Sequence, residues 1–381
     1  MSAYKKSPKI VISGYYGFGN CGDEAVLLSI LHCLKKLSPD VSITVLSRSP
    51  EKTRELYGVD AIDRWNLIAI GRALMGADLL ISGGGSLIQD VTSVRSPVYY
   101  LGIIKIALLF KTKVMIYSQG VGPLTIEKNR TQTAKVFDRC HAITVRDSDS
   151  AKLLREIGVK KEIHVTSDAV LALSRDNVNV GVMSELLLEL GIAGSDGKKR
   201  KPLLFVSVRL WKDNRHFAPI AKMLDAQTAD GWNVLLIPAH FPEDLRASEM
   251  LRDEMESEPH IIERCLTARE FLALTAISDK VFSMRLHGLI CAMAVGTPMV
   301  GLSYDPKVDA FMKQAGLEDF CLSFDDEDLQ HKGIAALCCD NTEKQPLPPN
   351  ADLEMRRREM QHRAWETAKI AAKLCLAYDK Y

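Results

Sequence analysis

The sequence predicts an α/β protein with two Rossmann-like domains that share a cleft. Apolar segments of strand length alternate with helical segments along the chain, a pattern typical of parallel sheets covered by helices. The alternation stops between Leu173 and Pro202, where charged residues and turn formers prevail. At 381 residues the chain is also longer than one ordinary domain, so two domains are expected.

The composition indicates a soluble cytoplasmic protein. Hydrophobic residues make up 47% of the chain, and its formal net charge is +1. No global field therefore attracts nucleic acid, and membrane contact is expected to be peripheral at most. The nine cysteines are scattered, with no C-x-x-C pair, which favours a reduced compartment and gives no sign of a metal site. The N-terminus lacks a signal-peptide core, and the apolar stretch 99–110 is too short to span a bilayer.

The first predicted domain covers residues 1–175. Its first strand runs directly into a turn that contains four glycines, followed by a helix from near Asp23. The glycines allow the backbone to approach a ligand, or they serve only tight packing between strand and helix. In the first case Asn20 and Asp23 face the cleft. Strands are expected at Lys9–Ser13, Ser42–Leu46, Ala77–Ser82, Val114–Ser118, His141–Val145 and Ile163–Val165, and helices at 50–57 and 148–157.

Three successive glycines, Gly83 to Gly85, follow the strand that ends at Ser82. Ahead of a helical stretch, such a triplet forms a bare backbone nest for a phosphate or carboxylate. Close packing without a ligand is the alternative. We therefore treat Gly84 and Gly85 as candidate substrate-binding residues.

The second predicted domain covers residues 202–350, after a linker at 176–201, and a C-terminal helix covers 351–381. Strands are expected at Leu203–Val208 and Asn233–Ile237, a helix at Phe271–Ile277, and a strand–helix–strand unit from Val281 to Leu302. Gly296 stands where a left-handed helix cap belongs, and Pro298 follows it.

The chemistry of that unit is concentrated where its strand gives way to its helix. Arg285 and His287 fall at this turn, at the carboxyl edge of the sheet, beside free backbone N–H groups. Such a position suits holding an anion and exchanging a proton with it. A surface ion pair for Arg285 and a capping role for His287 are the alternative.

Arg146, Arg209 and Arg285 each follow a predicted strand. Open parallel sheets bind ligands at this edge, so we expect the three arginines to converge on one cleft. Their guanidinium groups grip carboxylates and phosphates in bidentate fashion. Together with His287 they suit a small substrate with several negative charges, although any one of them taken alone is more typical of a structural ion pair.

Seven motifs extend in this order over nearly the whole chain and are specific jointly. They are GYYGFGNCGDEAVL (14–27), ISGGGSLIQD (81–90), SQGVGPL (118–124), ITVRDSDS (143–150), SDAVL (167–171), SVR (207–209) and RLHGLICAMAVGTPMVGLSYDPK (285–307). In these motifs the chain resembles the polysaccharide pyruvyl transferases, and specifically the bacterial enzymes that pyruvylate secondary cell-wall polymers for S-layer anchoring at the cell surface.

The resemblance implies a fold like that of the GT-B glycosyltransferases, with two domains facing across a cleft. It also implies phosphoenolpyruvate as donor and a cyclic 4,6-pyruvate ketal as product, on a sugar such as N-acetylmannosamine of a cell-wall glycan. No cofactor or metal is implied. The resemblance leaves open the acceptor sugar, whether it is lipid-linked, and the oligomeric state.

In this reaction His287 is the candidate acid, because histidine changes charge near neutral pH, and the three arginines hold the donor. The base for the sugar hydroxyl stays open among Asp168, Asp23 and His240. Asn20 and His240 are further candidate binding residues. Two other functions remain: a glycosyltransferase using a nucleotide-sugar, and a non-catalytic anion- or glycan-binding protein that would not need His287.

Overall fold

The computed structural model describes residues 7–91, 93–338 and 350–376, and it falls into two compact units. Unit 1 comprises residues 1–18, 23–172 and 360–381, and unit 2 comprises residues 19–22 and 173–359. Neither unit is therefore one continuous stretch of the sequence. The short segment Gly19–Gly22 belongs to unit 2, although the chain on both sides of it belongs to unit 1.

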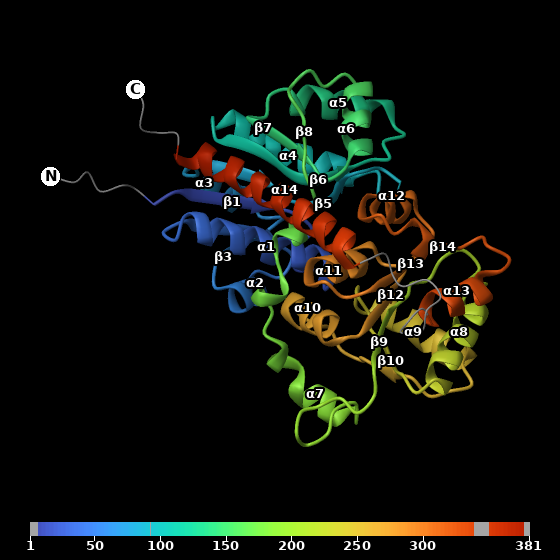
Figure 1. The fold of residues 1–381 in the computed structure, drawn as a ribbon. Coiled ribbons are helices and arrows are strands. Elements are labelled where there is room, and N and C mark those ends of the chain that lie inside the picture. Colours follow the sequence, from blue (N-terminus) through green and yellow to red (C-terminus); the bar gives the residue numbers. More distant parts are fainter. Residues whose placement is uncertain (1–6, 92, 339–349, 377–381) are drawn as a thin grey trace. The chain divides into compact units, whose positions relative to one another are not determined.

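Unit 1 contains a parallel sheet of order β3-β2-β1-β4-β6-β7-β8, with β5 paired to β6. Strands β1, β3, β5, β6, β7 and β8 of this sheet are labelled in Figure 1. All its strand pairs are parallel, as the alternating pattern predicted. The expected strands are present, and β3 and β5 are additional. The bounds are β1 Lys9–Ser13, β2 Ser42–Ser47, β3 Asp60–Asp63, β4 Leu79–Ser82, β5 Gly85–Ile88, β6 Lys113–Val121, β7 Ala142–Val145 and β8 His164–Val165.

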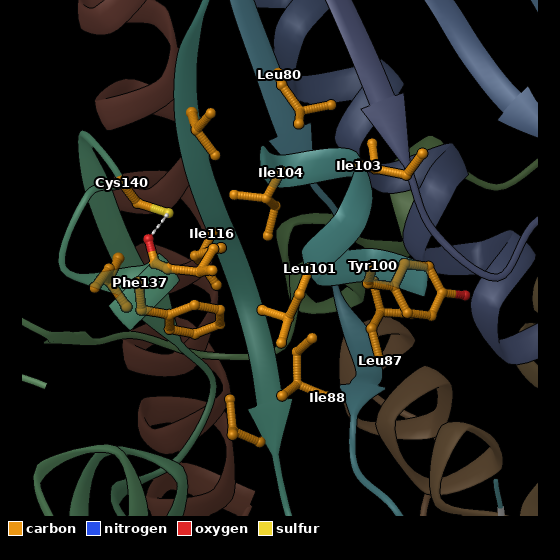
Figure 2. Packing of buried hydrophobic residues seen from close by; sticks show 14 of the residues in the cluster. Leu80, Leu87, Ile88, Tyr100, Leu101, Ile103, Ile104, Ile116, Phe137 and Cys140 are labelled. Atoms are coloured by element: carbon orange, nitrogen blue, oxygen red, sulfur yellow. Dashed lines mark hydrogen bonds between the residues drawn. The ribbon is translucent and has the colours of Figure 1, made fainter. Parts of the chain in front are cut away.

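The helices of unit 1 bury one apolar face against this sheet. Figure 2 shows Leu101 and Ile104 of α4 packed with Ile116 of β6 and Phe137 of α5. The branched side chains of the strands supply the other side of this core. The bounds are α1 Cys21–Leu37, α2 Pro50–Tyr57, α3 Leu67–Met75, α4 Ser96–Leu109, α5 Glu127–Phe137, α6 Ser148–Glu156 and the 3-10 turn η1 Ala169–Ala172.

The helix expected directly after the glycine triplet is absent, and that prediction is wrong. Gly85 has a φ of +84°, and the residues from Gly85 to Ile88 continue as strand β5, paired with β6. The next helix, α4, begins only at Ser96. Glycines that follow a strand therefore do not by themselves predict a helix, because a glycine with positive φ can equally lead the chain into another strand.

Unit 2 contains a second parallel sheet, of order β11-β10-β9-β12-β13-β14. The unit predicted around Arg285 is confirmed as β12, α11 and β13, and Gly296 caps α11 with a φ of +74°. The strands are β9 Leu203–Ser207, β10 Asn233–Leu236, β11 His260–Ile261, β12 Lys280–Ser283, β13 Met299–Ser303 and β14 Cys321–Ser323.

Several helices of unit 2 were not predicted from the sequence. Two of them, η3 and α7, lie within the predicted linker, residues 176–201. Met183 and Ile192 of this stretch are fully buried. The bounds are η2 Arg175–Asn177, η3 Val180–Met183, α7 Ser184–Glu189, α8 Phe217–Ala229, α9 Glu243–Glu254, α10 Ala268–Ile277, α11 Leu286–Val295, α12 Pro306–Ala315, η4 Glu318–Phe320 and α13 Leu329–Cys338.

The last helix, α14 (Asn350–Leu376), is counted with unit 2 up to residue 359 and with unit 1 from Met360. Arg357 of this helix pairs with Glu354 at 2.7 Å and donates to the carbonyl of Ala294, in the last turn of α11, at 3.3 Å. It therefore stabilises a helix C-terminus, where a cation is favourable. The predicted proline-rich loop 346–349 lies outside the described residues. Among the described residues, no helix is long and apolar enough to cross a membrane.

Candidate active site

Two of the predicted arginines lie side by side at the carboxyl edge of the unit 2 sheet. Strands β9 and β12 are neighbours, and Ser207 pairs with Ser283. Arg209 and Arg285 each follow two residues after these partners. The parallel register thus brings to one place two side chains that are far apart in the sequence.

Arg285 is held by a carboxylate that the sequence analysis missed. Its Nε donates to Asp244 Oδ2 at 2.8 Å, and its Nη2 donates to Asp244 Oδ1. Burial acts to lower the pKa of Arg285, but the charge and hydrogen bonds of Asp244 outweigh it and raise that pKa. Asp244 is almost fully buried and also accepts the backbone N–H of His240 at 2.9 Å. The Nε–Nη2 edge is therefore occupied, and an anion would meet the Nη1–Nη2 edge.

Arg209, by contrast, is oriented by neutral partners. Its Nη1 donates to the hydroxyl of Tyr304 at 3.0 Å, and its guanidinium lies 5.0 Å and 5.4 Å from the ring centroids of Tyr304 and Trp211. Aromatic faces attract a guanidinium without neutralising its charge. Arg209 is therefore a positioned cation that keeps its full electrostatic attraction for an anion.

His240 stands beside both arginines. It follows β10, and its Nε2 lies 3.6 Å from Glu243 Oε2. Burial lowers the pKa of His240, and the charges of Arg285 and Arg209 lower it further, against the opposing carboxylates of Glu243 and Asp244. The ring is therefore neutral near pH 7, a state in which it can accept a proton.

The segment Gly19–Gly22 closes this site from a distant part of the sequence. Cys21 donates its N–H to Ala239 at 2.7 Å, Phe241 donates to Gly19 at 3.1 Å, and Asn20 forms an antiparallel bridge with His240. The side-chain oxygen of Asn20 accepts the N–H of Gly22 at 3.0 Å. Asn20 thus fixes the turn that leads into α1, next to His240.

His287 lies against the backbone of Gly22. A Cβ placed on Gly22 would lie 2.5 Å from Cγ and 2.7 Å from Cβ of His287, closer than real side chains approach. Glycine at this position therefore makes room for the imidazole, which stands in the first turn of α11. The glycine-rich turn has a definite role here: it admits a side chain of the candidate site.

Unit 1 holds the other candidates. Arg146 follows β7 and is buried, with Nη1 3.2 Å from Asp168 Oδ2 and Nη2 3.2 Å from Ser86 Oγ. A Cβ on Gly120 would lie 2.7 Å from Nε of Arg146, so that glycine accommodates the guanidinium. The structure thus brings Arg146 and Asp168 together as a buried ion pair. Convergence of Arg146 with the two arginines of unit 2 stays a prediction.

The glycine triplet faces side chains on every side. A Cβ on Gly84 would lie 2.9 Å from Val26 Cγ1, one on Gly85 would lie 2.7 Å from Asp23 Oδ1, and one on Gly83 would overlap the hydroxyl of Tyr16. Burial, and then the nearby charges of Asp23 and Glu24, raise the pKa of Tyr16, so the phenol stays protonated. These contacts favour the packing alternative for Gly83 and Gly84, and binding of a ligand by Gly84 and Gly85 stays a prediction.

Sequence reasoning missed Asp244, Tyr304 and Trp211. Signals for two of them were present: Asp244 follows His240 by four residues in the acidic first turn of α9, and Tyr304 directly follows β13. In total, unit 2 gathers Asn20, Arg209, His240, Arg285 and His287, whereas Arg146, Asp168, Gly84 and Gly85 lie in unit 1. Among the described residues, no group of three or more His, Cys, Asp or Glu side chains is placed to hold a metal ion.

Solved structures define the class of fold. HepE from Anabaena, in complex with UDP-glucose, aligns with a TM-score of 0.59 at 13% identity over 96% of this chain and 98% of HepE. A glycosyltransferase from Rickettsia africae aligns with a TM-score of 0.59 at 11% identity, over 98% and 100% of the two chains. UDP-GlcNAc 2-epimerase from Neisseria meningitidis, bound to UDP-GlcNAc, gives 0.55 at 14% identity, over 97% and 99%. Such low identity shows the fold alone, which is the GT-B-like architecture expected above.

Within this fold, the chain belongs to the polysaccharide pyruvyl transferase family, whose sequence model matches residues 20–306. The amylovoran biosynthesis protein AmsJ of Erwinia amylovora is 23% identical, in an alignment that covers 82% of this chain and 87% of AmsJ. The family resemblance inferred from the motifs is therefore confirmed. Membership makes the chain a transferase that acts in pyruvylation of polysaccharide.

Proposed function

We propose that this protein transfers the pyruvyl group of phosphoenolpyruvate to a sugar of a polysaccharide precursor, forming a cyclic ketal and releasing phosphate. One observation carries the proposal: Arg209, Arg285, His240 and His287 gather at one edge of the unit 2 sheet. Two cations and two imidazoles suit a donor that has two anionic groups and must be protonated during the reaction.

Phosphoenolpyruvate carries a carboxylate and a phosphate, and each would be met by one arginine. Arg209 retains its full charge between its aromatic neighbours, and Arg285 offers its Nη1–Nη2 edge, since Asp244 takes the other. Charge-assisted hydrogen bonds of this kind contribute roughly 1.5–3 kcal/mol each. Arg146 is proposed to add a further cation from unit 1.

The reaction balances without a redox cofactor. A proton adds to the methylene carbon, which becomes the methyl group, and a sugar hydroxyl attacks the adjacent carbon. That hydroxyl loses its proton to a base. A second hydroxyl of the same sugar then attacks the same carbon as the bond to phosphate breaks, and its proton leaves with the phosphate. In the net reaction, the proton gained by the methyl group and the proton that leaves with the phosphate are balanced by the two protons lost from the acceptor hydroxyls.

The roles follow from position and charge. His287, in the first turn of α11 beside Arg285, is the proposed acid toward the methylene carbon. His240 is the proposed base among the three open candidates, because its lowered pKa keeps it neutral near pH 7. Asp168 is engaged by Arg146, and Asp23 lies against Gly85. Developing negative charge on the departing phosphate would be stabilised by the arginines.

For the acceptor we propose a secondary cell-wall polymer precursor, with N-acetylmannosamine pyruvylated across its 4- and 6-hydroxyls, as the motif resemblance implies. The test incubates the purified chain with phosphoenolpyruvate and a disaccharide that contains N-acetylmannosamine. Phosphate release should depend on the acceptor, and the product should gain the mass of pyruvate less one water. Consumption of a nucleotide-sugar in place of phosphoenolpyruvate would overturn the proposal in favour of a glycosyltransferase.

The same assay distinguishes an enzyme from a binding protein. His287→Ala should bind phosphoenolpyruvate with near-normal affinity in calorimetry, because the arginines remain. Turnover should fall by about 10²-fold or more, the usual contribution of a general acid. Near-normal turnover would remove the acid role from His287 and leave only a structural role beside Gly22.

A further inference from the structure

Exposed apolar side chains are concentrated on two neighbouring helices of unit 1, α3 and α4, and in the segments just before them. Thirteen large hydrophobic side chains are exposed in the described part of the chain, and eight of them fall between residues 65 and 109. Their exposed fractions range from 58% to 75%. Single exposed apolar residues are ordinary, but a cluster marks an interaction site. The eight are Trp65, Leu67, Ile68, Met75, Val91, Val94, Val98 and Leu109.

Five of these residues lie on α3 and α4, which pack against each other. At one end the rings of Trp65 and Tyr99 lie 5.1 Å apart, and the hydroxyl of Tyr99 donates to the carbonyl of Arg64 at 2.9 Å. Toward the other end, a Cβ on Gly71 would lie 3.7 Å from the ring of Phe110. We call the outward side of the two helices, with the loop before α4, the α3–α4 face.

The core does not require the exposed residues of this face. The inward side of α3 is filled by the buried Ile70 and Leu74. That of α4 is filled by the buried Leu101 and Ile104, which Figure 2 shows. The outward apolar side chains are therefore additional to what folding demands. An exposed apolar surface that folding does not require is typical of an interaction site.

The exposed charges on this face have one sign. Arg72, Arg95, Lys105 and Lys111 are exposed, and the sequence from 64 to 112 contains only two acidic residues. Both are engaged by the body of unit 1. Asp78 accepts the N–H of Lys9 at 2.8 Å, and the buried Asp90 accepts the N–H of Thr125 at 2.8 Å.

Trp65 is held in place at the edge of the face by a buried arginine. The guanidinium of Arg64 lies 4.2 Å from the Tyr99 ring centroid and 5.4 Å from that of Trp65, and it donates to the carbonyl of Gly14 at 3.3 Å. A tryptophan that is 60% exposed and fixed in orientation suits the boundary between water and hydrocarbon.

We infer that the α3–α4 face docks on an anionic lipid bilayer. Apolar residues interspersed with cations, and no exposed acid, match a negatively charged membrane surface. A second copy of the chain fits less well, because a two-fold contact would set each copy's cations against those of the other. Val91 follows the carboxyl end of β5 and Trp65 follows that of β3, so docking would bring this sheet edge to an acceptor carried on a lipid. That last consequence rests on the proposed function, whereas docking itself does not.

The test is co-sedimentation of the full chain with two kinds of vesicle, one of phosphatidylcholine alone and one of phosphatidylcholine mixed with phosphatidylglycerol. The fraction of protein bound is measured in the absence of phosphoenolpyruvate, so the result does not depend on catalysis. We expect binding only to the anionic vesicles, weakened by salt. The double variant Leu67→Ser, Ile68→Ser should bind at least tenfold more weakly. Arg72→Gln with Lys105→Gln should bind about 25-fold more weakly, at roughly fivefold per charge. A matched control, Val182→Ser with Leu188→Ser, removes exposed apolar groups of unit 2 and should bind normally.

Trp65 supplies a second readout, because it is exposed while the other three tryptophans are partly buried. Its emission should shift to the blue on anionic vesicles, and Trp65→Phe should abolish the shift. Absence of vesicle binding at low salt would overturn the inference, as would an equal loss in the control. A dimer in light scattering that the Leu67, Ile68 variant dissociates, without vesicle binding, would reassign the face to protein contact. If the chain binds vesicles but does not consume phosphoenolpyruvate, only the proposed function fails.

Discussion

Replacing Gly22 with alanine tests the candidate site at its tightest point. An alanine Cβ would lie 2.5 Å from Cγ of His287, whereas ordinary contact begins near 3.4 Å, so the imidazole must move by about 1 Å. The backbone conformation of Gly22 is compatible with alanine, because Gly22 is the second residue of α1 and lacks a positive φ. Alanine also stabilises a helix relative to glycine by about 1 kcal/mol. The strain therefore falls on His287. Since misplacing a catalytic group by 1 Å can lower the rate about 10²-fold, we expect a loss of that order in kcat.

The assay is acceptor-dependent phosphate release, with kcat and the KM for phosphoenolpyruvate determined separately and folding followed by circular dichroism. The matched control is Gly102→Ala, a helical glycine of α4 with nothing within 4 Å of its added Cβ, which should retain full activity. Gly22→Ala should keep its KM within a few-fold because Arg209 and Arg285 are undisturbed. Full turnover in a folded Gly22→Ala protein would refute the placement of His287 at the reacting atoms.

Three further changes test other parts of the molecule. Arg209→Lys should weaken phosphoenolpyruvate binding about 10- to 100-fold in calorimetry, because an ammonium cannot stack on Tyr304 or fork onto an anion; unchanged affinity would exclude a bidentate grip. Gly84→Ala should destabilise the fold by about 1–3 kcal/mol through its contact with Val26, and a larger loss of activity than of folded protein would indicate a bound ligand instead. Burial lowers the pKa of His216 to about 4, below its ordinary 6.5. The stability that the buried neutral imidazole contributes is therefore complete above pH 6.5. It falls by roughly 3 kcal/mol as the pH drops toward 4, because protons then bind the unfolded chain preferentially. His216→Leu should flatten this part of the curve of unfolding free energy against pH; an unchanged slope would contradict the role of burial.

Local sequence was sufficient wherever neighbouring residues determine the outcome. The strand–helix–strand unit around Arg285 could be predicted because an apolar strand, a helix of small apolar residues and a left-handed glycine follow one another directly. The same holds for β1 and α2, which have the predicted bounds. The stretch after the glycine triplet was mispredicted, since the pairing of β5 with β6 depends on a strand some thirty residues away.

The candidate site divides in the same way. The sequence by itself determined that Arg209, Arg285 and His287 stand at strand ends, because the position of a residue relative to its own strand is a local property. Only the tertiary structure decided which strand ends are neighbours, and so which side chains meet. Pairing of β9 with β12 sets the two arginines side by side, and Asp244 reaches Arg285 from another helix. Gly19–Gly22 joins the second unit through hydrogen bonds to residues more than two hundred positions away, contacts that no local pattern encodes.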